Sequence, residues 1–512
     1  MSRCLVMLEV SQKQAYIFES NKVKDNIVNS AVIARCLSPD YIKEVLGSYY
    51  TEENLVYSGG GHTILEYCND SMAEAKDQAK NAVKLLTKTI YTMFDGLMVF
   101  AKINEYDEQD SPQNNLKNLT AALERKKSVR SSGFYHGSFG IEAIDVNTLK
   151  PQKCQKSAND SFSGGKEEIE KEEYSYAQKS FIPKGYASTY RFEDLGGDKG
   201  TSNFIAVVSI DGNGMGKRVD HLYSLLKEEG IDRDWEKVKA KLKEFSDSID
   251  EDYKAAFREM TGEVKESLEN GALKGKLKLK SNYFPVRRII TAGDDICFVT
   301  EGRIGLECAR IYIEKLQQKK NKADGENYSA CAGVAIVHQK YPFYRAYELA
   351  EELCKSAKSA GAVLSKADDG RNVCSIDWHV EYGEVRSRED IRKDYISDDG
   401  SDLTGRPYVI TADSNVLAQI GDEKRFETFR NMMDEVLSYG KDYGDGKLKQ
   451  LRSVMKKGKN ETDNYVRFYQ LKYKLGKTYR AISDEAKVDL IENGLFDVIE
   501  LMDTFFFVTE VR

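Results

Sequence analysis

The segment VRRIITAGDDICFVT, Val286–Thr300, places two apolar runs on either side of Gly293 and two adjacent carboxylates, Asp294 and Asp295. Apolar runs joined by a glycine-bearing turn are typical of a β-hairpin, because glycine adopts backbone angles that a tight turn requires. Two like charges side by side at such a turn repel each other unless a positive group lies among them. The segment therefore predicts a hairpin that carries a charged site.

The segments around this hairpin alternate between strand-like and helical patterns. A buried strand and a long charged helical stretch precede the hairpin, and a helix, a strand and a further helix follow it. This order predicts a ferredoxin-like β-α-β-β-α-β unit. Its elements are expected at residues 203–210, 217–267, 286–300, 305–318, 329–337 and 343–360.

The N-terminal part of the chain repeats the same order with a different sequence. A strand, a helical segment, two short strands joined at Gly59, Gly60 and Gly61, a second helix and a last strand follow one another. They are expected at residues 4–10, 14–37, 54–67, 71–91 and 96–103. Two copies of one unit indicate duplication of a fold. The predicted fold class is α+β, with two ferredoxin-like domains in tandem and a helical C-terminal domain.

The chain of 512 residues is too long for one hydrophobic core, which suggests several domains. A polar, densely charged stretch separates the two copies, and helical apolar spacing returns near the C-terminus. The predicted domains are the first copy at 1–145, a charged connector at 146–200, the second copy at 201–385 and a helical domain at 386–512.

The composition excludes several classes of protein. Hydrophobic residues make up 41% and charged residues 31%, and no apolar run approaches the roughly 20 residues of a membrane helix. The N-terminus lacks the pattern of a secretory signal, so we expect a cytoplasmic protein without a membrane partner. The nine cysteines are scattered without a CxxC pair, which favours reduced core thiols over zinc ligands. The net charge of −7 argues against a broadly basic, nonspecific nucleic-acid binder.

Asp211 is predicted to lie at the same sheet edge as Asp294 and Asp295. It directly follows a buried strand, at a turn containing Gly212, and that strand is expected beside the hairpin. Clustered carboxylates need a cation, and ligation by oxygen alone favours Mg²⁺ or Mn²⁺. The predicted metal site therefore consists of Ile210, Asp211, Asp294 and Asp295, and the three acids are the predicted catalytic residues.

Residues suited to phosphate are expected at this edge. The segment GNGMGK offers backbone N–H groups that can approach phosphate oxygens, and Lys217 or Arg218 adds positive charge. Lys355 and Lys358 share one helix face and can hold a triphosphate. The predicted nucleotide-binding residues of the second copy are Asn213, Gly214, Met215, Gly216, Lys217, Lys355 and Lys358. With divalent ions, this set predicts in-line nucleotidyl transfer with release of pyrophosphate.

Each feature alone also has a plain structural interpretation. An Asp-Asp pair is common turn chemistry, a glycine run is common in turns, and lysines on one helix face are commonly solvated. Their joint occurrence at corresponding edges of one unit favours the catalytic interpretation. The histidines are expected to be structural, because none forms an HD dyad or metal spacing with a cysteine.

The motifs SIDGNGMGK, RRIITAGDDICFVT, SACAGVAIVHQKYPFYRAYELAEELCKSAK and SIDW resemble the second palm domain of the large polymerase-like subunit of type III CRISPR effector complexes. The resemblance covers roughly residues 1–145 and 200–385, so the two copies correspond to the two palms of that family. It implies that ATP is joined through 3′-5′ linkages into cyclic oligoadenylate second messengers for antiviral defence. The family's hairpin reads GGDD, whereas Ala292 replaces the first glycine here and both acids are kept.

The first palm is expected to receive a second ATP. EVSQKQAYIF stands where the family usually has an Asp-bearing version, and SGGGH replaces the acidic hairpin, so this copy lacks paired acids for metals. The resemblance implies that Ser58, Gly59, Gly60 and Gly61 lie close to the phosphates or ribose of that ATP. Glu9 is equally well interpreted as a plain strand-end acid.

Two departures from the family shape the expected partners. The family often carries an N-terminal HD nuclease domain and a zinc ribbon between the palms, whereas only Cys154 lies in the connector here. DNase activity is therefore expected to be absent, and the chain is either a standalone defence cyclase or a reduced subunit. In the second case guide or target RNA and other CRISPR effector subunits are its partners.

Two other functions stay open. One is a noncatalytic RNA-binding scaffold subunit of a CRISPR effector complex, against which the three retained acids argue. The other is a GGDEF-like cyclic dinucleotide synthase. Because GGDEF enzymes assemble their site from two chains, the paired palms in one chain favour the CRISPR-type interpretation.

Overall fold

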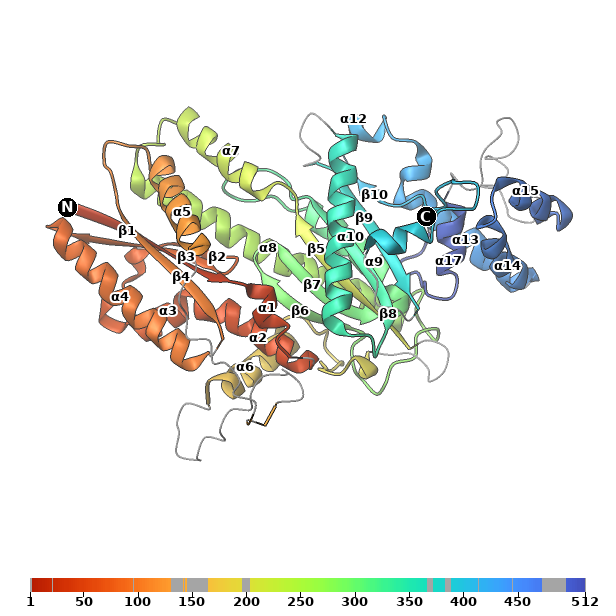
Figure 1. Ribbon diagram of the computed structural model, residues 1–512, viewed down its shortest axis with the longest axis horizontal. Coiled ribbons are helices and arrows are strands. Elements are labelled where there is room, and N and C mark those ends of the chain that lie inside the picture. The colour runs from red at the N-terminus through yellow and green to blue at the C-terminus, as the bar shows by residue number, and fades with distance from the viewer. Residues whose placement is uncertain are drawn as a thin grey trace.

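The computed structural model contains two β-sheets that lie one after the other along the long axis of the molecule (Figure 1). The N-terminal sheet has four strands and the second sheet has six. The structure describes residues 2–20, 22–94, 96–129, 141, 143–144, 164–195, 203–365, 372–382, 388–412, 414–443, 445–471 and 494–511. Helices cover both sheets, which confirms the predicted α+β class.

The first palm is built on an antiparallel sheet with strand order β2-β3-β1-β4. Its strands are β1 (Ser2–Ser11), β2 (Leu55–Gly59), β3 (His62–Asn69) and β4 (Met98–Glu105). Three helices connect β1 to β2, namely α1 (Lys13–Ile17), α2 (Val23–Cys36) and α3 (Pro39–Leu46), and α4 (Met72–Met93) connects β3 to β4. The order is the ferredoxin-like β-α-β-β-α-β expected from the sequence.

Local sequence signals explain where the helices of this palm begin and which face they bury. Ser71 caps α4 by accepting a hydrogen bond from the N–H of Glu74, which satisfies an otherwise free amide of the first turn. Alanine, leucine and isoleucine side chains recur at helical spacing and form its buried face, at Ala75, Ala79, Ala82, Leu86 and Ile90. Helix α5 (Pro112–Ser128) begins in the same way, with Ser111 as its cap and a proline in its first turn.

The second palm repeats this arrangement and extends it. Its six-stranded sheet has the order β10-β9-β8-β5-β7-β6, in which β8-β5-β7-β6 reproduces the ferredoxin-like order of the first palm. The strands are β5 (Phe204–Gly212), β6 (Val286–Ala292), β7 (Asp295–Glu301), β8 (Ala330–His338), β9 (Cys374–Glu381) and β10 (Tyr408–Thr411). β9 pairs with β8 in parallel. The predicted duplication of one fold is therefore confirmed.

Helices cover the two faces of the second sheet. The long stretch predicted at 217–267 is divided into α7 (Met215–Glu228) and α8 (Trp235–Glu269), because Gly230, with φ +69°, ends the first helix. α8 and α9 (Gly305–Gln317) pack together on one face. α10 (Phe343–Leu364) packs on the other face, where Gly333 of β8 lets the strand approach the helix backbone at Ala350.

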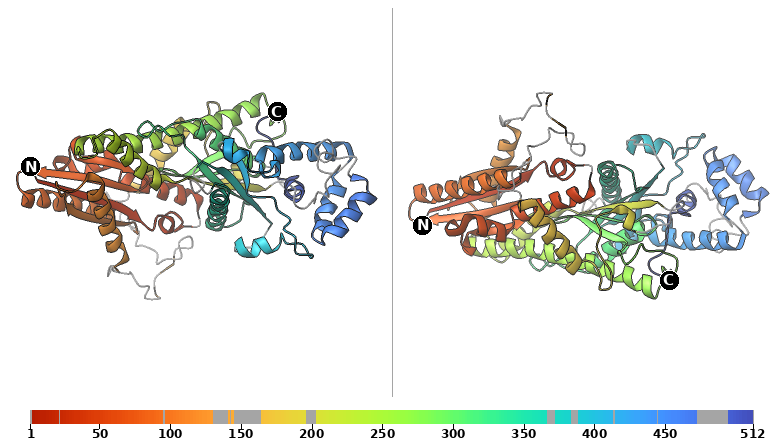
Figure 2. Two further views of the ribbon diagram at one scale, coloured as in Figure 1. Left: turned by 90° about the horizontal axis from the view of Figure 1, so that it is seen from above. Right: turned by 90° about the horizontal axis from the view of Figure 1, so that it is seen from below.

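Helix α8 joins the two palms into one body. Its N-terminal half, with Trp235, Leu242 and Phe245, packs with apolar residues of the first sheet. Its C-terminal half, with Phe257 and Met260, belongs to the core of the second palm. The helix has 35 residues and is therefore about 50 Å long, long enough to reach both sheets. The two further views show this part of the chain alongside both palms (Figure 2).

The connector contains a helix that the sequence patterns did not predict, whereas the C-terminal region is largely helical, as expected. Within the predicted connector, α6 (Gly164–Ser180) packs against α2 and buries Ile169 and Ala177. The C-terminal region contains α11 (Arg388–Lys393), α12 (Ser414–Leu417), α13 (Phe426–Tyr443), α14 (Gly446–Met455), α15 (Lys459–Phe468) and α17 (Leu495–Leu501). It also supplies β10, which pairs with β9 of the palm sheet, so the predicted helical domain is fused to that sheet.

Hydropathy and cysteine placement can be followed within the described part of the chain. No helix there has both the length and the apolar character required to cross a bilayer. The described cysteines are free thiols, and all of them except Cys68 are buried. Cys154 lies outside the described residues.

Candidate active site between the palms

The acidic hairpin of the second palm touches the glycine hairpin of the first. β6 ends at Ala292, whose register partner is Asp295, so Gly293 and Asp294 form the turn. Gly293 has φ +65°, a conformation that glycine adopts without steric cost. A Cβ atom at Gly293 would lie 3.3 Å from the Cα of Gly60. The tips of the two hairpins therefore meet backbone to backbone.

The replacement of the first hairpin glycine by alanine has a local explanation. Ala292 lies in strand β6 and pairs with β7, where an L-residue fits the extended backbone. The left-handed conformation of the turn falls on Gly293 instead. The motif therefore keeps its glycine at the position whose backbone requires one.

Asp211 and Asp295 are brought together by strand register. β5 and β7 are antiparallel neighbours, and Asp211 is the register partner of Asp295. Lys358 of α10 lies 2.5 Å from a carboxylate oxygen of Asp211 and also donates to the carbonyl of Gly212 at 2.8 Å. Both acids line a small depression of about 50 Å³ together with Glu351 and Lys355. The lining of this depression therefore includes two of the three predicted acids and Lys355, and Lys358 contacts one of these acids, Asp211.

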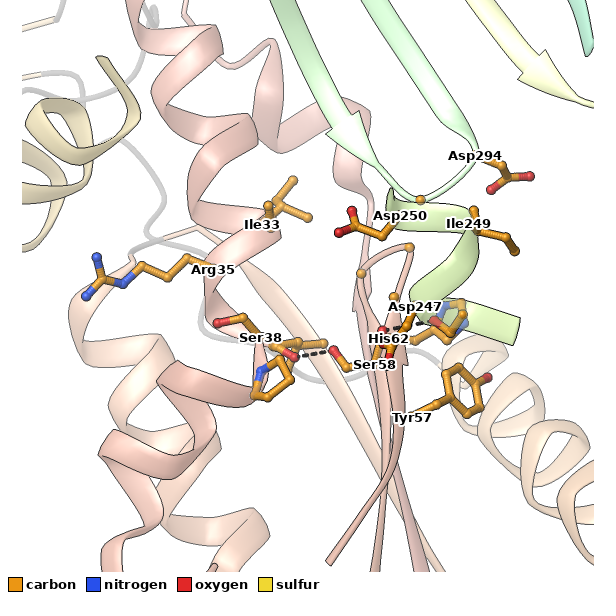
Figure 3. A pocket seen from close by; sticks show the side chains of 18 of the residues that line it. Ile33, Arg35, Ser38, Tyr57, Ser58, His62, Asp247, Ile249, Asp250 and Asp294 are labelled. Atoms are coloured by element: carbon orange, nitrogen blue, oxygen red, sulfur yellow. Dashed lines mark hydrogen bonds between the residues drawn. The ribbon is translucent and has the colours of Figure 1, made fainter. Parts of the chain in front are cut away.

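Asp294 lies on the other side of the hairpin. It lines a large cavity of about 1350 Å³ between the palms, together with the glycine hairpin and residues of α8. Figure 3 shows Asp294 at the tip of its hairpin, above the hairpin of Ser58 and His62, and Asp247 and Asp250 line the same cavity. The three acids thus share one sheet edge, as predicted, but they open into two different hollows. Among the residues that the structure describes, no group of three or more His, Cys, Asp or Glu side chains is arranged to hold a metal ion.

The acids nevertheless influence one another electrostatically. Burial and the charge of Asp211 raise the pKa of Asp294. Burial in the surrounding protein and the charges of Asp294 and Asp211 raise the pKa of Asp295 to about 7, although its side chain is exposed to solvent on one side. Lys13 and Lys358 oppose this effect. Carboxylate oxygens are the donors that Mg²⁺ and Mn²⁺ prefer, so the chemistry of the three acids fits such an ion, although their side chains are not gathered into one site in this structure.

The turn after β5 places its residues as follows. The side chain of Asn213 is buried and donates to the carbonyl of Val373 at 2.9 Å, so it holds the turn against the residue that precedes β9. Gly214, with φ +62°, is the N-cap of α7, which begins at Met215. Gly216 and Lys217 are exposed on the first turn of that helix. The first turn of α7 therefore presents free amides and a lysine beside Asp211, whose neighbour Ile210 is buried in β5.

Arg218 has a different role from the one that the sequence suggested. Its guanidinium is buried and pairs with Asp324 through two hydrogen bonds of 2.9 and 2.8 Å. It also lies over the ring of Tyr328 at 4.7 Å. A phosphate role for Arg218 is therefore corrected to a structural one, because the bidentate pair fixes α7 to the loop before β8.

The glycine hairpin of the first palm is anchored through Ser58. The hydroxyl of Ser58 donates to the carbonyl of Leu37 at 2.7 Å, and Ser246 of α8 donates to the carbonyl of Ser58 at 3.1 Å. Gly59 lies so close to Ser246 that a Cβ atom would be 2.8 Å from its hydroxyl oxygen. Ser58, Gly59, Gly60 and Gly61 all line the large cavity. Their backbone faces that space, whereas the Ser58 hydroxyl is used within the protein.

Tertiary structure adds residues that the sequence did not single out. Lys13, in the first turn of α1, donates to the carbonyl of Gly60 and contributes positive potential at Asp294 and Asp295. Asp247 and Asp250 of α8 line the large cavity. No sequence motif marks these residues, because they reach the site from distant segments. Glu9 forms an ion pair with Lys127 at 3.0 Å, which favours its interpretation as a structural acid.

Comparison with known proteins finds a family match over part of the chain. Residues 204–364 match the family model of the Cas10/Cmr2 second palm domain. No curated protein matches the chain at a significant level.

The chain also resembles several solved structures. One is a Csm1-Csm4 cassette in complex with one ATP, with a TM-score of 0.56, 14% identity, and coverage of 98% of this chain and 70% of that chain. Another is the cassette in complex with cA3, with a TM-score of 0.54 and the same identity and coverage. A third is the Csm1-Csm4 subcomplex of the type III-A CRISPR-Csm interference complex, with a TM-score of 0.52, 15% identity and coverage of 98% and 70%. At these identities the likeness concerns the fold. The family match over β5–α10 and the likeness in fold therefore make residues 204–364 similar to the second palm domain of Cas10/Cmr2 proteins.

Proposed function

We propose that this protein is a metal-dependent nucleotidyltransferase that joins ATP into cyclic oligoadenylate-type second messengers for antiviral defence. The observation that carries the proposal is the contact between the acidic hairpin at Gly293 and the glycine hairpin at Gly60, with Asp211 and Asp295 in register beside it. The fold likeness to Csm1 structures in complex with ATP and with cA3 supports the same proposal.

The reaction requires two nucleotides whose reacting atoms meet. A new bond forms between the 3′ oxygen of one nucleotide and the α-phosphorus of the other, and pyrophosphate and the hydroxyl proton are released. In our proposal, the nucleotide that supplies the triphosphate lies at the second palm, and the other lies against the glycine hairpin of the first. The hairpin contact sets the separation of the two nucleotides, which is a positioning effect.

The residues of the second palm divide the work. Asp211, Asp294 and Asp295, with the backbone at Ile210, would hold Mg²⁺ or Mn²⁺. When bound, such ions neutralise the triphosphate and activate the attacking hydroxyl. Lys355 and Lys358 would pair with phosphate oxygens, and Lys358 must then leave Asp211, with which it forms its ion pair. The first turn of α7, from Asn213 to Lys217, would offer amides to the same phosphates.

The first palm supplies the acceptor side. Ser58, Gly59, Gly60 and Gly61 would bind the second ATP through backbone groups, because the three glycines carry no side chains of their own. Lys13 would provide positive charge between the two nucleotides, since it already lies at the carbonyl of Gly60. We therefore add Lys13 to the residues that the sequence singled out.

The decisive experiment is incubation of the purified protein with each labelled nucleoside triphosphate and Mg²⁺ or Mn²⁺, with and without RNA. We expect oligoadenylate products by mass spectrometry, and loss of these products in the double variant Asp294→Ala, Asp295→Ala with an unchanged circular dichroism spectrum. Equal output from the double variant would refute the proposal. Products from GTP instead of ATP would favour a GGDEF-like synthase, and binding of RNA without any product would favour a scaffold.

The similar solved structures contain Csm1 together with Csm4, which supports a second proposal about partners. We propose that this chain associates with another CRISPR effector subunit and guide or target RNA. Co-expression with the genomic neighbours followed by size-exclusion chromatography tests this assembly. Activity of the purified chain alone, unchanged by RNA and by those neighbours, would show a standalone enzyme.

A further inference from the structure

Arg288 of β6 is a buried cation without a hydrogen-bonding partner among the described residues. Only 6% of its surface is exposed, and it lines the large cavity between the palms. Neither its Nε nor its Nη1 atom has a hydrogen-bond partner, and the described residues offer it no ion pair. Its guanidinium lies over the rings of Phe181 at 4.6 Å and Phe257 at 5.6 Å. Apolar rings therefore surround the guanidinium, whose Nε and Nη1 atoms are inaccessible to solvent, while the residue as a whole lines the cavity.

Every other buried arginine of the described part has a carboxylate partner. The contrast is sharpest with its neighbour Arg287, which lies 2.7 Å from a carboxylate oxygen of Glu173 on α6. The remaining pairs are Arg218 with Asp324, Arg310 with Glu307, Arg406 with Asp497, and Arg430 with Glu307. Among the buried arginines of the described residues, Arg288 thus differs from the others in having no carboxylate partner.

Physical chemistry makes such an exception informative. Removing a cation from water costs several kcal/mol unless a counter-charge or hydrogen bonds replace the lost hydration. The two aromatic rings provide only a cation–π contact, which offsets a part of that cost. Burial lowers the pKa of Arg288 to about 10, so the side chain is still charged at neutral pH. A buried guanidinium with free donors indicates that its partner is an anion supplied from outside the chain.

The cavity around Arg288 has room for such an anion and for more than one small molecule. Its volume of about 1350 Å³ exceeds the roughly 300–1,000 Å³ typical of a site for one ligand. The lobe at Arg288 is bounded by α2, α6, α8 and β6, through Ser30, Ala31, Ile169, Tyr176, Ala177 and Lys254. Asp211 and Asp295 line the other hollow, so this lobe is separate from the depression that holds those two acids.

We propose that the lobe bounded by α2, α6, α8 and β6 binds a phosphate-bearing ligand whose anionic group pairs with the guanidinium of Arg288. Arginine suits phosphate because its planar donors match the phosphate oxygens. The rings of Tyr176 and Phe181, 5.5 Å apart, offer an apolar wall for a flat group attached to the phosphate. Lys254, in an ion pair of 2.6 Å with Asp250, lies at the same lobe. A nucleotide fits this chemistry, whether it is the ATP substrate or a separate effector.

The test measures binding without catalysis. Metal-free protein in EDTA is titrated with orthophosphate, AMP and ATP, with acetate as a carboxylate control, and the melting temperature and binding heat are recorded. We expect phosphate-bearing ligands to raise the melting temperature, and Arg288→Met to weaken their binding at least tenfold. Arg345→Met removes an equal charge from the exposed face of α10 and is expected to bind like the native protein. Stabilisation by orthophosphate and AMP indicates a general phosphate site, and stabilisation by ATP alone indicates the substrate.

Several results would overturn the proposal. They are equal phosphate binding by Arg288→Met and Arg345→Met, absence of binding by any phosphate compound, and equal stabilisation by acetate. If Arg288→Met fails to fold, Ile169→Trp provides a second test of phosphate binding in the lobe, because an indole at this position fills the lobe without changing its charge. Loss of binding in Ile169→Trp supports the proposal, and native binding there refutes it.

The outcome is distinguishable from that of the proposed catalytic function. Asp295→Asn, which is expected to lose product, should bind phosphate at Arg288 like the native protein, because Asp295 lines the other hollow. Phosphate binding without any product would therefore refute the enzyme proposal and support the phosphate site at Arg288. If the protein makes product but its phosphate binding does not depend on Arg288, the enzyme proposal is supported and the phosphate site is refuted.

Discussion

Replacing Gly293 by alanine tests whether the contact between the two hairpin tips is required for activity. At φ +65° a residue with a Cβ atom costs roughly 1–2 kcal/mol relative to glycine. The new Cβ would also lie 3.3 Å from Cα and 3.4 Å from N of Gly60, and these backbone atoms cannot rotate away as a side chain could. Alanine should therefore both strain the turn and push the tips of the two palms apart.

A matched control separates these two effects. Gly275 has φ +72°, but a Cβ atom there would meet no atom within 4 Å, so Gly275→Ala carries the backbone cost alone. Both variants are unfolded in guanidinium chloride, and product formed from ATP is quantified by mass spectrometry. We expect Gly275→Ala to lose about 1–2 kcal/mol of stability with normal product formation. We expect Gly293→Ala to lose somewhat more stability and at least about tenfold in product rate, equivalent to about 1.4 kcal/mol in the barrier.

The comparison gives a clear refutation. If Gly293→Ala and Gly275→Ala make product at the same rate, the hairpin contact does not set the position of the nucleotides. Equal losses of activity in both variants would attribute the effect to general destabilisation. Only a loss specific to Gly293 supports the positioning argument.

Three further predictions concern charge. Asp295→Asn should abolish product formation. The metal-free variant should be as stable as the native protein or slightly more stable, because the substitution removes a carboxylate that Asp294 and Asp211 repel. Calorimetry measures this stability, and a large loss would contradict the prediction. The pKa of Asp295 is raised from 3.8 to about 7, so the folded metal-free protein holds this proton more tightly than the unfolded chain and loses stability as pH rises through that range. Mn²⁺ should therefore raise the melting temperature more at pH 8 than at pH 5, and an equal rise would count against the carboxylates as its ligands. Arg218→Met should cost about 3–5 kcal/mol by leaving Asp324 buried and unpaired, and adding Asp324→Leu should restore much of that loss in chemical unfolding.

Local chemistry was sufficient to predict the repeated fold. The apolar periodicity of each segment, the serine caps of α4 and α5, and the glycines at the two hairpin turns are set by neighbouring residues. The turn sets the register of β6 with β7, and the buried apolar faces of β5 and β7 set the register that puts Asp211 opposite Asp295. The duplicated order of elements and the acidic hairpin could therefore be recognised without a structure.

The content of the candidate site depended on tertiary structure. Side chains on either side of a tight turn point to different faces, so Asp294 opens into the large cavity and Asp295 into the small depression. Lys13 reaches the site from the other palm, and Arg218 finds its partner Asp324 far along the chain. Strand β10 and helix α6 became ordered elements because the palms offered them surfaces to pack against. Among the described residues Arg288 has no hydrogen-bonding partner, and this is visible only once its neighbours in space are known, because it depends on the surrounding structure and not on the local sequence.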